Sequence, residues 1–157
     1  MSAIVLRPMQ QSDLPIFREW LVLPHVAAWY HEPEDWIAEI EQQDGVFAFV
    51  HHFIAQSDGI AVGFCQYYSY WLGGEDWHGD IPLSGTYSID YMIGDVMYLG
   101  KGFGKRIILA LLEQIRNEPD AVRVIVQPEP DNKASCGVLR SCGFRFDESN
   151  HIFLLEL

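Results

Sequence analysis

The chain has 157 residues, a length that predicts a single domain spanning residues 1–157. Its net charge of −12 argues against nucleic acid and against an anionic membrane surface as partners. No apolar run approaches the roughly 20 residues of a membrane span. The three cysteines contain no CxxC pair, so we expect no disulfide framework and no cysteine zinc site. With no signal-peptide pattern either, the sequence favours a cytoplasmic location.

The first part of the chain predicts one strand, a helical region and then two long strands. Ser12 is suited to cap the first helix, Pro24 to break it, and Asp58-Gly59 to form a hairpin turn. The expected elements are a strand at Ile4–Arg7, helices around Leu14–Leu21, Val26–Trp29 and Glu34–Gln43, and strands at Val46–Ala55 and Ile60–Trp71. Within the third helix we expect Trp36 to pack in the core.

The second part alternates strands with two helices. The expected elements are a polar loop at Gly73–Gly85, strands at Thr86–Ile93 and Val122–Val126, helices at Lys105–Arg116 and Asn132–Ser141, and final strands at Phe144–Phe146 and Ile152–Leu155. A glycine turn at Gly100–Gly104 joins the strand to the helix that follows it. This order predicts an α/β (α+β) unit with antiparallel hairpins first and a strand–turn–helix–strand crossover later.

The charge is distributed unevenly along the chain. Residues 1–98 hold two basic and fourteen acidic side chains, whereas residues 99–157 hold eight of each. A solvated acidic surface that aids solubility explains many of these carboxylates. The asymmetry also suits a first part that attracts a cationic ligand and a second part that tolerates an anionic one.

The most specific local pattern is the glycine turn Leu99-Gly100-Lys101-Gly102-Phe103-Gly104-Lys105. Alternate glycines let a ligand approach the backbone, and the free N–H groups at the start of the next helix form an anion site. The pattern is neither a Walker A loop nor a dinucleotide fingerprint, because glycines are missing at the required positions. A tight turn that holds no ligand is the alternative interpretation.

The turn and a later segment together resemble the GNAT superfamily of acyl-CoA-dependent N-acetyltransferases. The later segment reads Asn132-Lys133-Ala134-Ser135 and closes with Cys142-Gly143-Phe144. Within the superfamily, the Ile89-Asp90 region and the stretch Gln127–Asn132 are similar to aminoglycoside 6′-N-acetyltransferases. A second resemblance runs to acyltransferases of lysine-derived siderophore precursors and of ribosomal proteins.

The resemblance implies a mixed, mostly antiparallel central sheet flanked by helices, with acetyl-CoA as co-substrate. The implied cofactor-binding residues are Met92, Ile93, Leu99, Gly100, Lys101, Gly102, Phe103, Gly104, Lys105, Asn132 and Ser135. Two positions depart from the family pattern. Leu99 stands where the family has Gln or Arg, and Leu139 stands where many members have the Tyr that protonates the departing thiolate. Ser135 or water is the expected substitute.

Acetyl transfer to an amine requires a group that removes a proton from the amine. Asp90 is the expected catalytic carboxylate, because its strand leads into the glycine turn. A solvent-facing Asp is the alternative from the pattern alone. The backbone N–H groups of residues 92–94 are the expected donors to the oxyanion.

The expected acceptor is a cationic small-molecule amine, in particular an aminoglycoside. The expected acceptor-binding residues are Glu75, Asp76, Trp77, Asp80, Asp90, Trp29 and Tyr30, since carboxylates pair with ammonium groups and indole faces suit sugar rings. Gln127 stands where the aminoglycoside enzymes tend to carry an acid, which keeps a siderophore amine or a protein N-terminus as alternatives. A non-catalytic acyl-CoA-binding module is the alternative from another class. The histidines show no metal-site spacing, and both a monomer and a homodimer fit the sequence.

Overall fold

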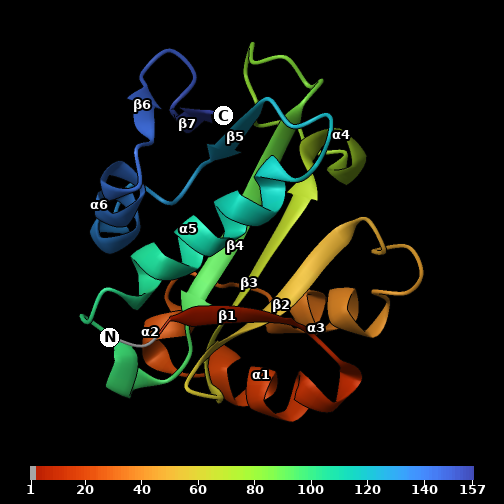
Figure 1. The fold of residues 1–157 in the computed structure, drawn as a ribbon, viewed down its shortest axis with the longest axis vertical. Coiled ribbons are helices and arrows are strands. Elements are labelled where there is room, and N and C mark those ends of the chain that lie inside the picture. The colour runs from red at the N-terminus through yellow and green to blue at the C-terminus, as the bar shows by residue number, and fades with distance from the viewer. Residues whose placement is uncertain (1–2) are drawn as a thin grey trace.

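The computed structural model describes residues 3–157, whose strands form one sheet in the order β1-β2-β3-β4-β5-β7-β6 (Figure 1). The strands are β1 (Ile4–Pro8), β2 (Val50–Ser57), β3 (Ile60–Ser69), β4 (Thr86–Ile93), β5 (Arg123–Val126), β6 (Arg145–Asp147) and β7 (Ile152–Glu156). Among these, only the β4–β5 pair is parallel. The expected mixed, mostly antiparallel sheet is confirmed.

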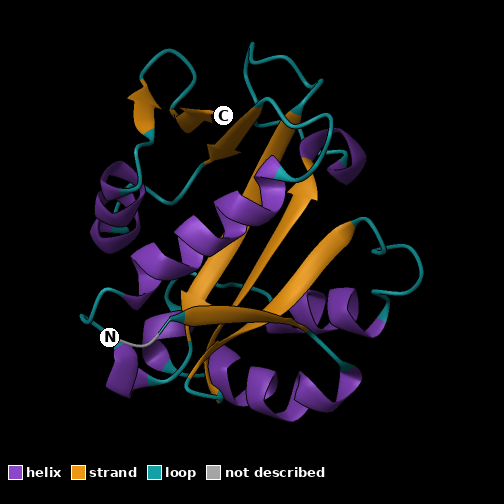
Figure 2. Cartoon of the chain, in the orientation of Figure 1, coloured by secondary structure: helices purple, strands orange, loops and turns teal. Residues whose placement is uncertain are grey.

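Helices cover both faces of the sheet, and α5 crosses in front of it in Figure 2. The helices are α1 (Leu14–Leu21), α2 (Pro24–Ala27), α3 (Pro33–Glu41), α4 (Tyr70–Gly73), α5 (Phe103–Arg116) and α6 (Lys133–Ser141), with 3₁₀ turns η1 (Gln11–Asp13) and η2 (Val96–Tyr98). The α5 helix connects β4 to β5, as a crossover between parallel strands requires.

The sheet separates two apolar cores, and the residues of β4 alternate between them. Tyr87 and Ile89 pack with the apolar stripe of α5, and the partly buried Tyr91 joins the same cluster. Met92 packs instead with side chains of α1, α2 and α3 on the opposite face. Because strand side chains alternate, Asp90 lies on the α1–α3 face and Tyr91 on the α5–α6 face.

Two strand boundaries differ from the sequence expectation. The strand expected from Val46 begins only at Val50, because the amide groups of residues 47, 48 and 50 bond within a turn, for example Phe47 N–H to the Gln42 carbonyl at 3.2 Å. The strand expected to reach Trp71 ends at Ser69, and Tyr70–Gly73 form α4 instead. Gly74 ends α4 with φ of 67°, a left-handed conformation that glycine adopts readily.

The helix starts also differ in detail. Ser12 lies inside η1, and Asp13 is the N-cap residue of α1, with its carboxylate turned back to accept the Gln10 N–H at 2.8 Å in a capping box of η1. Pro24 does more than break a helix, because it begins α2. The α5 helix starts at Phe103, two residues before the expected start, and its N-cap is Gly102 with φ of 83°.

Candidate active site

The site lies where β4 and β5 diverge. Their pairing covers only residues 86–88 of β4, so within residues 3–157 β3 is the only strand beside residues 89–93. On the side of β4 away from β3, the Tyr91 carbonyl accepts a hydrogen bond from the Tyr30 hydroxyl at 2.5 Å. The Ile93 carbonyl accepts one from His25 Nε2 at 2.9 Å. A cleft of about 1160 Å³ opens along this edge.

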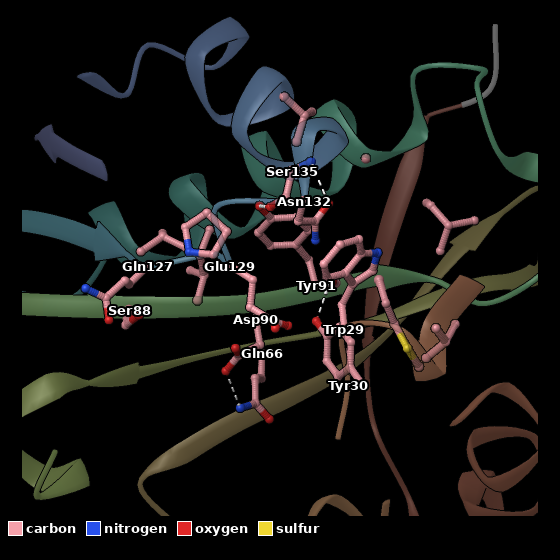
Figure 3. A pocket seen from close by; sticks show the side chains of 18 of the residues that line it. Trp29, Tyr30, Gln66, Ser88, Asp90, Tyr91, Gln127, Glu129, Asn132 and Ser135 are labelled. Carbon is pink, nitrogen blue, oxygen red and sulfur yellow. Dashed lines mark hydrogen bonds between the residues drawn. The ribbon is translucent and has the colours of Figure 1, made fainter. Parts of the chain in front are cut away.

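Asp90 projects into the cleft from the α1–α3 face of the sheet (Figure 3). Gln66 Nε2, on the paired residue of β3, donates to Asp90 Oδ2 at 2.8 Å. The pKa of Asp90 is raised to about 6, because burial and, to a smaller extent, the charge of Glu75 raise it more than the Gln66 hydrogen bond lowers it. A carboxylate with this pKa is ionised at neutral pH and basic enough to accept a proton from a bound amine.

Two further carboxylates lie near Asp90 in the cleft, which Glu129 also lines. Glu39 reaches it from α3, and burial together with the charges of Asp90 and Glu75 raises its pKa to about 7. Glu75 follows α4 and accepts the Tyr68 hydroxyl at 2.5 Å and the Trp77 indole N–H at 3.0 Å. Since carboxylates of like charge raise one another's pKa, a bound cation would relieve their repulsion.

Aromatic side chains surround the three carboxylates. The Phe, Tyr and Trp residues that line the cleft are Trp29, Tyr30, Trp36, Phe47, Phe49, Tyr68, Trp77 and Tyr91. Trp36 is partly buried and packs against the core around Phe64, as expected, and it also lines the cleft beside Tyr30, with ring centroids 4.9 Å apart. Aromatic faces combined with carboxylates suit an organic cation or an amino sugar.

The glycine turn borders the other end of the cleft. Gly100 and Gly102 have φ of 71° and 83°, and a Cβ placed on either would meet no atom within 4 Å. The turn therefore leaves open space beside exposed backbone at the N-terminus of α5, where N–H groups and the helix dipole favour phosphate. Lys105 lines this end of the cleft. The residues fit an acyl-CoA pyrophosphate.

A second polar cluster lies on the α5–α6 face of β4. Asn132 caps α6 by accepting the Ser135 N–H at 3.1 Å, and the hydroxyl oxygens of Ser135 and Tyr91 are 2.5 Å apart. Leu139, one turn further along α6, is fully buried in the apolar core. The position at which the family resemblance implies a Tyr is therefore closed to the cleft.

The cleft brings together most of the residues expected from the sequence. Those that line it are Trp29, Tyr30, Glu75, Trp77, Asp90, Met92, Ile93, Leu99, Gly100, Gly102, Gly104, Lys105, Asn132 and Ser135. Four expected site residues are not part of its lining. Lys101 and Asp76 are exposed to solvent. The Phe103 ring is buried against α5 and Tyr98, and the Asp80 carboxylate accepts from Asn150 Nδ2 at 2.7 Å.

Sequence reasoning missed several side chains of the cleft. These are His25, Glu39, Phe47, Phe49, Gln66, Tyr68 and Tyr91. Gln66 is 3% exposed, and its Oε1 atom has no hydrogen-bond partner among residues 3–157. The register of β3 against β4 would have pointed to Gln66, because it pairs directly with Asp90. The sequence carries no comparable signal for Glu39 or the Phe residues.

Within residues 3–157, no group of three or more His, Cys, Asp or Glu side chains is arranged to hold a metal ion. No helix within the same range is long and apolar enough to cross a membrane.

A diverging strand edge, an open glycine turn beside a helix N-terminus and a partly buried carboxylate in one cleft are the arrangement that an acyl-CoA-dependent acyltransferase requires. The chain belongs to the acetyltransferase (GNAT) domain family, whose model matches residues 9–152. The expected GNAT fold and acetyl-CoA-dependent N-acetyltransferase activity are thereby confirmed.

Similar proteins include several aminoglycoside acetyltransferases. The chain is 28% identical over 149 residues to aminoglycoside N(6′)-acetyltransferase type 1 of Klebsiella pneumoniae, an alignment that covers 91% of this chain and 74% of the relative. The structure of aminoglycoside acetyltransferase AAC(6′)-Ib with coenzyme A matches with a TM-score of 0.82, 23% identity and coverage of 98% and 95%. Its complex with ribostamycin and coenzyme A matches with a TM-score of 0.82, 25% identity and coverage of 98% and 93%.

Proposed function

We propose that the protein transfers the acetyl group of acetyl-CoA to a primary amine of an aminoglycoside. The observation that carries this proposal is Asp90, a carboxylate with a pKa of about 6 in a cleft lined by acids and aromatic rings. An ammonium group requires such a base before its nitrogen can attack a thioester. The similarity to aminoglycoside acetyltransferases over 91% of the chain supports the choice of acceptor.

The donor side of the reaction falls to the glycine turn and the edge of β4. The N–H groups at the start of α5 and the Lys105 ammonium hold the pyrophosphate, and the pantetheine arm follows the diverging edge toward Asp90. The backbone N–H of Ile93 on the exposed edge of β4 donates to the oxyanion that forms on the thioester carbonyl, whereas the Gly94 N–H expected to do so donates to the Val62 carbonyl at 2.9 Å. The chain itself thus supplies the donor site, the oxyanion site and the base.

The acceptor side falls to the face of the sheet that carries α1–α3. Glu39 and Glu75 pair with ammonium groups that do not react, while the aromatic rings cover the sugar faces. Gln66 Oε1 accepts an N–H or O–H of the acceptor, because an unpartnered buried oxygen gains most from such a bond. We place this activity in the cytoplasm, a reducing compartment that suits the free thiols of Cys65, Cys136 and Cys142.

The experiment that tests the proposal is a steady-state assay of CoA thiol release with a panel of amines. The panel contains an aminoglycoside with a 6′-amine, its 6′-hydroxyl counterpart, a lysine-derived hydroxamate precursor and a peptide with a free N-terminus. We expect release with the 6′-amine, and the rate with its 6′-hydroxyl counterpart shows whether the 6′ nitrogen or another amine of the aminoglycoside is the acceptor. Activity confined to either of the last two acceptors would overturn the aminoglycoside assignment, and no release with any amine would favour a non-catalytic binding module.

A further inference from the structure

When the thioester breaks, negative charge develops on the sulfur. This chain has no polar side chain at the position where the family resemblance implies a Tyr that stabilises the sulfur. Leu139 occupies the position in question and is 0% exposed within the core beneath α6. It has no polar atom, and its burial excludes it from the cleft. Another hydrogen-bond donor on the same side of β4 is therefore needed if the protein stabilises the departing sulfur.

Two hydroxyl groups meet on that side of the strand. The Tyr91 and Ser135 oxygens are 2.5 Å apart, and both residues line the cleft. Ser135 is fixed because its backbone N–H donates to the capping Asn132 side chain at 3.1 Å. Figure 3 shows Tyr91 reaching from β4 toward Ser135 and Asn132. The pair has one spare hydroxyl proton, because only one of the two protons lies between the oxygens.

The position of this pair relative to Asp90 is the second observation. Asp90 and Tyr91 are neighbours on β4, and their side chains leave the strand on opposite faces. A thioester carbon held at the edge of the strand would therefore face the carboxylate from the acceptor side. Its sulfur would face the hydroxyl pair from the donor side.

We propose that the Tyr91–Ser135 hydroxyl pair donates a hydrogen bond to the sulfur of CoA as it departs, in place of a side chain at position 139. The inference rests on the proposed acetyl transfer. In that step the amine nitrogen forms a bond to the acetyl carbon and the carbon–sulfur bond breaks, with its electron pair going to sulfur. Asp90 takes the ammonium proton before attack and releases it to solvent, then takes the second N–H proton as the amide forms, and the thiolate is protonated by solvent after it leaves.

The environment of Tyr91 suits a donor that keeps its proton throughout. Burial raises the pKa of the Tyr91 phenol, the bond to Ser135 lowers it, and the charge of Asp90 raises it. The hydroxyl is therefore neutral over the working pH range, and it stabilises the thiolate without becoming tyrosinate. Hydrogen bonds to charged groups are about twice as strong as those between neutral groups.

The test is the affinity for CoA and for desulfo-CoA, which lacks the thiol, measured by calorimetry between pH 6 and 10. In the unaltered protein we expect the ratio of the affinity for CoA to the affinity for desulfo-CoA to increase with pH once the bound thiol ionises. In Tyr91→Phe the increase should begin about one pH unit higher, and kcat should fall about tenfold to hundredfold. The affinity for desulfo-CoA should not change.

Tyr87→Phe is the matched control. Tyr87 lies on the same face of β4, but its hydroxyl donates to Asp120 at 2.6 Å, outside the cleft lining. Its pH dependence for CoA should match that of the unaltered protein. Ser135→Ala, which retains the Tyr91 ring, should shift the ionisation of the bound thiol in the same direction as Tyr91→Phe.

Unchanged pH dependence in folded Tyr91→Phe and Ser135→Ala would overturn the inference. Failure of the unaltered protein to bind both CoA and desulfo-CoA would instead overturn the proposed function, so the two failures are distinguishable. Tyr91→Phe keeps the aromatic ring in the core, and Ser135→Ala provides a second variant with an intact Asn132 cap.

Discussion

The two faces of β4 differ in how their functional residues are distributed along the chain. The donor side, where we propose that acetyl-CoA binds, consists of two continuous segments, the glycine turn Leu99–Lys105 and the start of α6 from Asn132. The acceptor side uses side chains from five separate places, namely residues 29–30, 36–39, 47–49, 66–68 and 75–77. Continuous motifs can be recognised in a sequence, whereas an assembled surface depends on the fold. The substrate preference of the protein therefore lies in the part that is hardest to predict.

The largest effect should come from Asp90, where the two sides meet. Asp90→Asn keeps the shape of the side chain but removes the base, so kcat should fall about 10²- to 10⁴-fold. In the unaltered protein, kcat/KM should fall as pH drops below about 6, because the carboxylate whose pKa burial raises to about 6 becomes protonated.

Two comparisons make the Asp90 prediction specific. Asp76→Asn removes an exposed acid that does not line the cleft and should change kcat less than about twofold. The pH profile of kcat/KM, measured with acceptors of different amine pKa, distinguishes ionisation of the enzyme from ionisation of the acceptor. A low-pH decline that follows the acceptor's pKa and persists in Asp90→Asn would remove Asp90 from the role of base.

The glycine turn should give the next largest effect, confined to the donor side. Gly104 lies in the first turn of α5, and a Cβ there would make an ordinary 3.8 Å contact with Val138 Cγ2. Gly104→Ala should therefore fold normally while placing a methyl group where the phosphates approach the backbone. We expect acetyl-CoA affinity to fall at least about tenfold by calorimetry, with acceptor KM little changed.

Gly137→Ala provides the matched control for the turn. A Cβ on Gly137 meets no atom within 4 Å, and the residue lies in α6 outside the cleft lining. Its acetyl-CoA affinity should equal that of the unaltered protein. Unchanged affinity in Gly104→Ala would move the pyrophosphate site away from this turn.

A higher salt concentration should weaken acceptor binding moderately and acetyl-CoA binding less. Residues 1–98 carry all of the net charge of −12, and Glu39, Glu75 and Asp90 in the cleft belong to that part. Raising NaCl from about 0.05 to 0.5 M should increase the KM of a polycationic acceptor about fivefold through screening. The affinity for acetyl-CoA should change less. An acceptor KM that does not respond to salt would contradict electrostatic capture.

The sequence predicted the order of helices and strands well because their patterns are local. Thr86–Ile93 was expected with the observed boundaries, and the α5 stripe from Ile107 to Ile115 follows helical spacing. The turn around Phe47 resembled a strand because aromatic and β-branched residues favour strands, but its amide groups bond within the turn. Glu39 resembled an ordinary surface acid of an amphipathic helix, and only the packing of α3 brings it into the cleft.

The smallest effect concerns Glu39 and is measured on stability. Burial raises its pKa from the ordinary 4.5 to about 7. Between these two values the folded protein holds a proton that the unfolded chain has released, so stability decreases as pH rises through this window. The loss is complete above pH 7. Glu39→Gln removes the ionisable group and should therefore raise Tm at pH 8 by on the order of a few degrees.

The same substitution should raise no Tm at pH 4, where Glu39 is protonated in both states. Glu41→Gln is the matched control, because Glu41 ends α3, is exposed and does not line the cleft. It should leave Tm unchanged at both pH values. A gain of equal size at pH 4 and pH 8 would mean that packing of the amide, rather than the buried charge, causes the stabilisation. A gain at pH 8 alone, with a raised KM for a polycationic acceptor, would show that the acceptor side sacrifices stability to hold a carboxylate ready for a cation.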